Sequence, residues 1–253
     1  MLIYTYVSSV LFSFLYQLST NDNFNKRYLI LRSQCDFCQS KLKYYDLIPI
    51  ISFLILKGKS RCCKQSLNYS YLIGELLALL PILLVYYQLI NINPQLYLIS
   101  FLFLLVMSIN DIEDYSINLY FLIIFTTVLL FTTQIFLNTF ILTFIISHLF
   151  YIFMNHYIGY GDILLFNILS LFLSMNFMFY LILFTFMIGG LITIIIKTFF
   201  NHNIKYIPLI PFIFLSFIFV SSFYPFLITT LNISLLFHLS FYRLFLFLVF
   251  ILI

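Results

Sequence analysis

The feature that most constrains this chain is its long apolar runs, each close to the length needed to cross a lipid bilayer. Outside a polar stretch at residues 19–71, these runs follow one another almost without a break. A helix needs about 20 apolar residues to cross a hydrocarbon core about 30 Å thick. The chain is 64% hydrophobic and only 8% charged, whereas soluble proteins contain about 25% charged residues. The sequence therefore predicts a membrane protein in contact with the lipid bilayer, and it argues against nucleic-acid binding.

The runs predict an all-α polytopic membrane helical bundle of about eight transmembrane helices with one large cytoplasmic loop. The first run has no basic flank and no small-residue cleavage site, so we expect a retained span and not a signal peptide. Pro81 is expected to kink the second run. The count is eight or nine, depending on the short run at 163–173 and on the last run. The predicted spans are residues 2–18, 72–90, 96–112, 117–134, 135–155, 163–173, 177–197, 207–223 and 235–253.

Basic residues are concentrated in one segment, which predicts the orientation. Nine of the 12 Lys and Arg residues lie between positions 21 and 71, namely Lys26, Arg27, Arg32, Lys41, Lys43, Lys57, Lys59, Arg61 and Lys64. Because Lys and Arg stay on the cytoplasmic side of short loops, we expect a multi-pass plasma-membrane protein with its N-terminus outside. The predicted domains are a first span (1–18), a basic cysteine-containing loop (19–71) and a membrane-embedded domain (72–253).

Two acidic clusters fall on the same predicted cytoplasmic face. Asp111 is the acid closest to the apolar part of the third span, and Asp162 opens a later span after Gly159, Tyr160 and Gly161. Ionisable groups at membrane depth are costly and are candidate functional residues. The competing interpretation is that the acidic residues of both clusters are interfacial charges and helix caps. We interpret Glu113 and Asp114 in this way. The two glycines favour function at Asp162, because they allow a sharp turn and a close backbone approach.

Two carboxylates brought together from different helices could perform hydrolysis. Like charges about 3 Å apart cannot both ionise, so such a pair shares one proton. One carboxylate then acts as general base on a water, and the other acts as general acid toward the scissile carbonyl and the leaving amine. Asp111 and Asp162 are candidates for this aspartic-protease chemistry, although their spacing in sequence does not establish the pairing.

These residues carry a resemblance to a known family. Residues 159–162 match the GxGD motif of membrane aspartic proteases, and the chain resembles the bacterial type IV prepilin peptidases along nearly its whole length. Asp111, followed by Ile117, is similar to the first catalytic segment of the family. Further similar stretches, in the same order, are Ser13-Phe14, the Cys-x-x-Cys of residues 35–38, the Tyr-Asp-Leu-Ile-Pro run of residues 45–49, Gly74-Glu75-Leu76-Leu77 and the two late prolines at 208 and 211.

The resemblance implies an aspartic endopeptidase that removes the short basic leader of prepilins or competence pseudopilins at the cytoplasmic membrane face. It implies that Asp111 and Asp162 are the catalytic pair and that proteolysis needs no cofactor. Gly159, Tyr160 and Gly161 would shape the second motif. It also associates Glu75 and the first loop with N-methylation by S-adenosylmethionine. The chain differs from the family pattern at Asn118, Leu164 and Ile210, where the family has Pro, Lys and Gly.

Four cysteines in the predicted cytoplasmic loop are candidate metal ligands, because disulfides are disfavoured in that compartment. They are Cys35, Cys38, Cys62 and Cys63. A Cys-x-x-Cys followed by a second thiol pair is typical of a zinc site. The pattern is irregular, because the second pair is adjacent and the family's usual third cysteine is Ser60 here. Two interpretations stay open: zinc held by three or four of these thiols, or a decayed site with free thiols.

Three other classes of protein remain as alternatives. A small transporter would show paired repeats or charges near the midplane, whereas these acids lie at one rim. A non-catalytic or degenerate family member would tolerate the loss of either aspartate. The presenilin-like branch of the GxGD proteases would need a Pro-Ala-Leu motif late in the chain, which residues 208–211 do not provide.

Overall fold

The computed structural model describes residues 1–20, 33–35, 37–154, 158–200 and 207–230. The predicted span 235–253 and the basic residues Lys26, Arg27 and Arg32 lie outside the described residues. The described residues form helices and contain only two isolated β-bridges, with no strand. The helices are α1 (Leu2–Ser19), η2 (Tyr44–Leu47), α2 (Ile51–Ile55), α3 (Tyr69–Leu77), α4 (Leu80–Tyr86), α5 (Pro94–Asp114), α6 (Leu119–Thr132), α7 (Leu137–Met154), α8 (Tyr160–Phe172), α9 (Met175–Phe200) and α10 (Ile210–Thr230).

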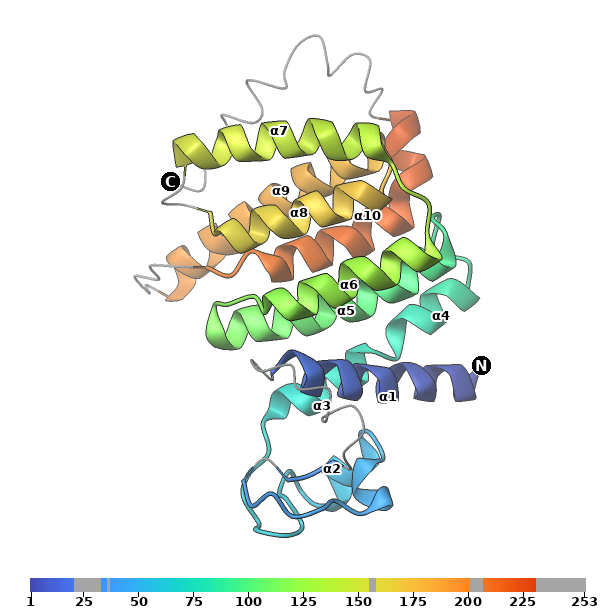
Figure 1. The fold of residues 1–253 in the computed structure, drawn as a ribbon, viewed down its shortest axis with the longest axis vertical. Helices are drawn as coiled ribbons and strands as arrows, with labels where there is room; N and C mark the ends of the chain where they lie inside the picture. The colour runs from blue at the N-terminus through green and yellow to red at the C-terminus, as the bar shows by residue number, and fades with distance from the viewer. Residues whose placement is uncertain (21–32, 36, 155–157, 201–206, 231–253) are drawn as a thin grey trace.

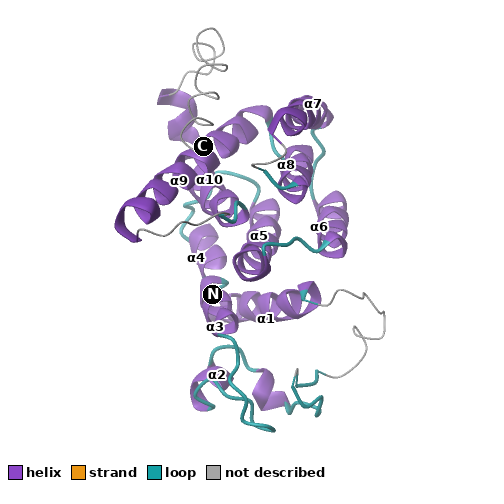
Figure 2. Ribbon diagram, turned by 90° about the vertical axis from the view of Figure 1, so that its left-hand side faces the viewer, coloured by secondary structure: helices purple, strands orange, loops and turns teal. Residues whose placement is uncertain are grey.

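The long helices lie side by side and alternate in direction along the chain (Figure 1). As a result, one end of the bundle contains the last residues of α1, α5, α7 and α9 and the first residues of α3, α6, α8 and α10. We call this the Asp111 end of the bundle. Figure 2 looks roughly along α5, α6 and α8 and shows α5 between α1, α6 and α10. Helix α5 packs against α1, α3, α4, α6 and α10, so its two ends are held by elements from most of the chain.

The predicted class, an all-α polytopic membrane protein, is confirmed. Among the residues that the structure describes, five segments are long and apolar enough to cross a membrane: α1, α3 with α4, α5, α9 and α10. Helices α6, α7 and α8 are also apolar but shorter. The 13 residues of α8 extend only about 20 Å at 1.5 Å per residue, less than the thickness of a hydrocarbon core. The short predicted span at 163–173 therefore corresponds to a short helix.

Local sequence signals set several helix boundaries. The side chain of Asn93 accepts a hydrogen bond from the Gln95 amide at the start of α5, and Pro94 occupies the first turn. Asn118 likewise accepts hydrogen bonds from the amides of Tyr120 and Phe121 at the start of α6. Such caps satisfy amides that have no partner within the helix. The second predicted span is divided into α3 and α4, with Pro81 in the first turn of α4, as its expected kink requires.

The core follows α5 and its neighbours. Tyr97 stacks on Phe217 of α10, and Phe101 meets Phe214 edge to face. The contact between α1 and α3 is closer still, because a Cβ atom added at Gly74 would lie 1.9 Å from the ring of Phe12. Only glycine allows the two helices to approach this closely. Helix α1 is thus fixed against the same helices that carry the acidic residues.

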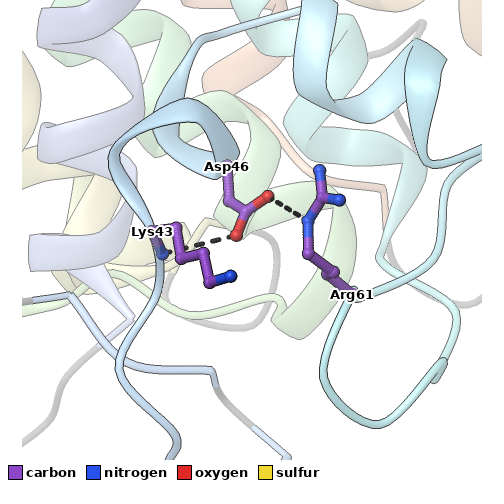
Figure 3. Close-up of polar contacts among 3 residues, drawn as sticks. All are labelled: Lys43, Asp46 and Arg61. Atoms are coloured by element: carbon purple, nitrogen blue, oxygen red, sulfur yellow. Dashed lines mark hydrogen bonds and ion pairs between the residues drawn. The ribbon is translucent and has the colours of Figure 1, made fainter.

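The segment 33–68 lies outside the bundle, beside α1 and α3 (Figures 1 and 2). Its charged residues hold it together locally. The carboxylate of Asp46 accepts a hydrogen bond from the guanidinium of Arg61 at 2.7 Å and one from the Lys43 amide at 3.3 Å (Figure 3). The guanidinium also lies 4.7 Å from the centre of the Tyr45 ring. The bond to Asp46 raises the pKa of Arg61. Residues 43–47 and the turn around residue 61 therefore form one unit.

Candidate active site and cysteine cluster

Asp111 lies in the last turn of α5 and is only 6% exposed. The helix ends just beyond it, because Tyr115 adopts a left-handed conformation (φ 52°) and its amide donates to the Asp111 carbonyl. The Asp111 carboxylate accepts a hydrogen bond of 3.1 Å from the backbone amide of Ile210, the first residue of α10. The first amides of a helix lack partners within the helix and carry partial positive charge. The start of α10 thus supplies a donor to this buried carboxylate.

Asp162 is the third residue of α8 and is partly buried. Its amide donates to the carbonyl of Gly159, which caps the helix. A Cβ atom added at Gly159 would lie 3.2 Å from a carboxylate oxygen of Asp162. The neighbouring Gly161 lies against Ile117, which follows α5 by three residues. Asp111 and Asp162 therefore lie at the same end of the bundle, and their pairing stays a prediction.

The remaining residues of the predicted motif have different surroundings. A Cβ atom added at Gly161 would lie 2.7 Å from the Cδ1 atom of Ile117, so the glycine allows α8 to begin against the segment between α5 and α6. Tyr160 is 46% exposed, and its ring lies near the rings of His148 and Tyr151 on α7. Gly161 therefore contributes to the approach of the helices, whereas Tyr160 lies on the outer side of the motif.

Glu75 forms a separate buried junction between α3, α1 and the loop. It is 7% exposed and accepts hydrogen bonds from the Ser13 hydroxyl and the Ile50 amide, both at 2.6 Å. Ile50 has a positive φ of 63° immediately before α2, a conformation that is unfavourable for a β-branched residue. Both carboxylate oxygens of Glu75 are thus used to hold α1 and a strained turn in place.

Sequence reasoning missed the role of Glu113, which was interpreted as an interfacial charge. Its carboxylate accepts hydrogen bonds from the Tyr16 hydroxyl at 2.8 Å, from the Asn68 side chain at 2.5 Å and from the Ser70 hydroxyl. It therefore joins α1, the start of α3 and the end of α5. The partners lie 43 to 97 positions away in sequence, so no local pattern could have revealed them.

A ladder of polar side chains between α7 and α8 was also missed. Thr143 donates to the Ser170 hydroxyl at 2.6 Å, and Ser147 donates to the Asn167 side chain at 3.1 Å. Hydrogen bonds between helices stabilise helix pairs in membranes, where the hydrophobic effect contributes little. These bonds help to hold the helix that carries Asp162.

The four cysteines converge in the segment outside the bundle. The sulfur atoms of Cys35, Cys38, Cys62 and Cys63 all lie within 4.8 Å of one another. The measured separations are 3.8 Å for Cys35–Cys63, 4.0 Å for Cys62–Cys63 and 3.0 Å for Cys38–Cys62. Four thiolates around a tetrahedral zinc ion, with Zn–S bonds of about 2.3 Å, would lie about 3.8 Å apart. The donor set and its spacing therefore fit a zinc ion.

The protonation of these thiols is uneven. The hydrogen bond with Cys62 stabilises the Cys38 thiolate and lowers the pKa of Cys38 to about 6, and Ser40 adds to this effect. The same bond raises the pKa of Cys62 to about 11. A hydrogen bond with Ser60 lowers the pKa of Cys63. Metals bind thiolates. The lowered pKa values of Cys38 and Cys63 therefore favour metal binding at these two sulfurs.

Comparison with known proteins finds relatives of the N-terminal part of the chain. Residues 6–89 match the model described as Bacterial Peptidase A24 N-terminal domain. A protein of Pectobacterium carotovorum subsp. carotovorum named Prepilin leader peptidase/N-methyltransferase is 37% identical over 84 residues, 32% of this chain and 29% of the relative. Proteins of the same name from Vibrio cholerae and Bacillus subtilis are each 44% identical over 45 residues, 18% of this chain and 18% of each relative.

The chain thus covers less than a third of the length of each of these relatives. No solved structure matches the chain. The matches nevertheless agree with one another in name, and the family model spans α1, the cysteine-containing segment, α3 and α4. They confirm the resemblance to the type IV prepilin peptidases, with residues 6–89 as the matched domain.

Proposed function

We propose that this chain is a prepilin leader peptidase that hydrolyses its substrate with Asp111 and Asp162. The observation that carries the proposal is the placement of both acids at one end of the bundle, where the Ile210 amide is bonded to Asp111 and α8 begins against Ile117. The curated relatives named above support prepilins or pseudopilins as the substrate class.

The proposed reaction needs one proton shared by the pair. The amide of Ile210 stabilises negative charge on Asp111, so we assign Asp111 as the base that removes a proton from water. Asp162 donates its proton to the scissile carbonyl oxygen as the hydroxide adds to the carbonyl carbon. The proton taken up by Asp111 then passes to the leaving amine as the C–N bond breaks, and one hydroxyl of the tetrahedral intermediate returns a proton to Asp162, which restores the shared proton of the pair. The products are a free leader carboxylate and a new pilin N-terminus, and one water is consumed.

The orientation belongs to the same proposal. The basic segment leaves α1 and re-enters α3 at the Asp111 end of the bundle. Positive residues mark the cytoplasmic side, so the aspartates would face the cytoplasm and Met1 would face outward. A short basic leader on the cytoplasmic side of its hydrophobic helix would then reach the pair.

We further propose that the four cysteines hold a structural zinc ion. When bound, zinc would link residues 35–38 to residues 62–63 and fix the segment outside the bundle. For methyl transfer, Glu75 is only 7% exposed and each of its oxygens accepts a hydrogen bond, from Ser13 and from Ile50, so it offers little surface to S-adenosylmethionine. We assign Glu75 a positioning role, in which it holds α1 and the turn before α2.

Co-expression with a prepilin tests the proposed peptidase. The substrate should carry a basic leader ending in glycine before its hydrophobic helix, and leader removal is followed by the mass of the pilin. We expect Asp111→Asn and Asp162→Asn each to lower the rate at least about 100-fold, since each removes an acid–base group. Both variants should still accumulate in membranes.

The matched control is Asp114→Asn, which neutralises an exposed acid three residues from Asp111. It should cleave at the wild-type rate. Wild-type cleavage by either Asp111→Asn or Asp162→Asn would refute the assignment of the catalytic pair. Absence of leader removal by the wild-type protein itself would favour a non-catalytic membrane protein or a transporter.

A further inference from the structure

The segment outside the bundle contains two turns of the same construction. In the first, residues 34–41, Gln34 and Lys41 form a β-bridge and the Cys35 amide donates to the Ser40 carbonyl. In the second, residues 59–66, Lys59 and Ser66 form a β-bridge and the Ser60 amide donates to the Gln65 carbonyl. The second turn therefore repeats the first at an offset of 25 positions.

The agreement extends to the details of the backbone. The amide of Gln39 donates to the Cys35 carbonyl at 2.8 Å, and the amide of Lys64 donates to the Ser60 carbonyl at 3.0 Å. Gln39 and Lys64 both have a positive φ, 54° and 57°. Neither is a glycine, so both turns impose the same unfavourable conformation at the same position. The sequence similarity between the turns is too weak to show this relationship.

The repeat makes Ser60 the counterpart of Cys35 and Cys63 the counterpart of Cys38. Cys35 and Ser60 are buried to the same degree, 5% and 6% exposed. At the fourth position of each turn, the first has Phe37 and the second has Cys62. The second turn thus lacks the thiol at the position of Cys35 and carries an additional thiol at the position of Phe37.

We infer that Cys62 supplies the fourth metal-binding thiolate in place of the one that Ser60 lacks. The sulfur of Cys62 lies 3.0 Å from that of Cys38 and 4.0 Å from that of Cys63, so it completes the group of four. The Ser60 hydroxyl accepts a hydrogen bond from the Gln65 amide and is bonded to the Cys63 sulfur at 3.0 Å. Ser60 is thus a positioning residue that holds the turn and orients Cys63.

This inference rests on the proposed zinc site, and cobalt substitution in the full-length protein in detergent tests it. Thiolate-to-cobalt charge-transfer absorption reports how many thiolates bind, and competition with a chelator gives the affinity. We expect Cys62→Ser to lower the zinc affinity more than about 100-fold, because it removes a direct ligand. Its charge-transfer absorption should fall by about a quarter, from four thiolates to three.

The decisive variant moves the thiol back to the regular position. Cys62→Ser combined with Ser60→Cys should restore the full charge-transfer absorption and bring the affinity to within about tenfold of wild type. Ser60→Ala should keep the absorption of four thiolates, because it removes no thiolate, and should lower the affinity only about tenfold, because it removes the contact that orients Cys63. It also tests the hydroxyl as a ligand, because a ligating hydroxyl would make Ser60→Ala, and not Cys62→Ser, the damaging change.

The outcomes separate the two proposals. If the wild-type protein binds neither zinc nor cobalt, the proposed metal site is wrong. If the wild type binds metal but Cys62→Ser keeps its absorption and affinity, or if the double variant binds no better than Cys62→Ser, the relocation of the ligand is wrong while the metal site stands.

Discussion

The backbone amide of Ile210 donates a 3.1 Å hydrogen bond to the buried carboxylate of Asp111, joining residues 99 positions apart. The amide belongs to the first residue of α10 and the carboxylate to the last turn of α5. The position of Asp111 is therefore fixed by a helix that lies far away in the sequence.

Replacing Ile210 by proline should remove this donor while keeping a residue that is tolerated at the start of a helix. A hydrogen bond to a charged group contributes about 1.5–3 kcal/mol, so we expect leader cleavage to slow at least about tenfold. Ile210→Ala keeps the amide and serves as the control. Equal rates for the two variants, measured with the same co-expressed prepilin, would show that the amide does not support the reaction.

The contact between Gly161 and Ile117 predicts a suppressor pair. In Gly161→Ala the new Cβ would lie 2.7 Å from the Cδ1 atom of Ile117, so the start of α8 must shift and cleavage should fall about tenfold or more. Ile117→Val removes that Cδ1 atom and should restore most of the rate when combined with Gly161→Ala. Single-turnover cleavage of the four proteins measures this, and failure of Ile117→Val to help would mean that the clash is not the cause.

Glu75 should contribute to stability by holding the turn before α2. Glu75→Ala leaves the Ile50 amide without its acceptor, and such a loss costs about 1–3 kcal/mol. Ser13→Ala removes a single donor to the same carboxylate and should cost less. Thermal unfolding in detergent ranks the variants, and limited proteolysis should show earlier cleavage near residues 50–56 in Glu75→Ala. Equal stability of Glu75→Ala and wild type would contradict this.

The cysteine cluster predicts a pH-dependent reactivity once metal has been removed by a chelator. The pKa of Cys38 is lowered to about 6 by its hydrogen bond with Cys62, whose own pKa is raised to about 11. The thiolate is the reactive form, so alkylation of Cys38 should rise from pH 5 to pH 7 and then level off. At pH 8 Cys62 should still be protonated and slow to react.

Mass spectrometry of the alkylated peptides resolves the two residues. In Cys62→Ala the midpoint for Cys38 should move to higher pH, because the main group that stabilises its thiolate is gone. A midpoint for Cys38 near that of an ordinary thiol in the wild-type protein would show that the hydrogen bond is absent.

The sequence by itself determined the helices and much of their ends. Apolar runs predict spans, and caps such as Asn118 and the proline at 81 act within a few residues of their own position. The same local information identified Asp111, Asp162 and the cysteines as candidates, because charged groups and thiols are conspicuous in so apolar a chain. It also misread Glu113, since an acid at the end of a span has the same local pattern whether or not it has partners.

Only the tertiary structure decided which of these groups meet. The contacts of Glu113 with Tyr16, of Asp111 with Ile210 and of Cys35 with Cys63 all join distant segments. Hydropathy and capping depend on near neighbours, and they act in the same way for many possible arrangements of the helices. The contacts across the bundle depend on which faces pack together, and here close approaches such as Gly74 on Phe12 and Gly161 on Ile117 select one arrangement.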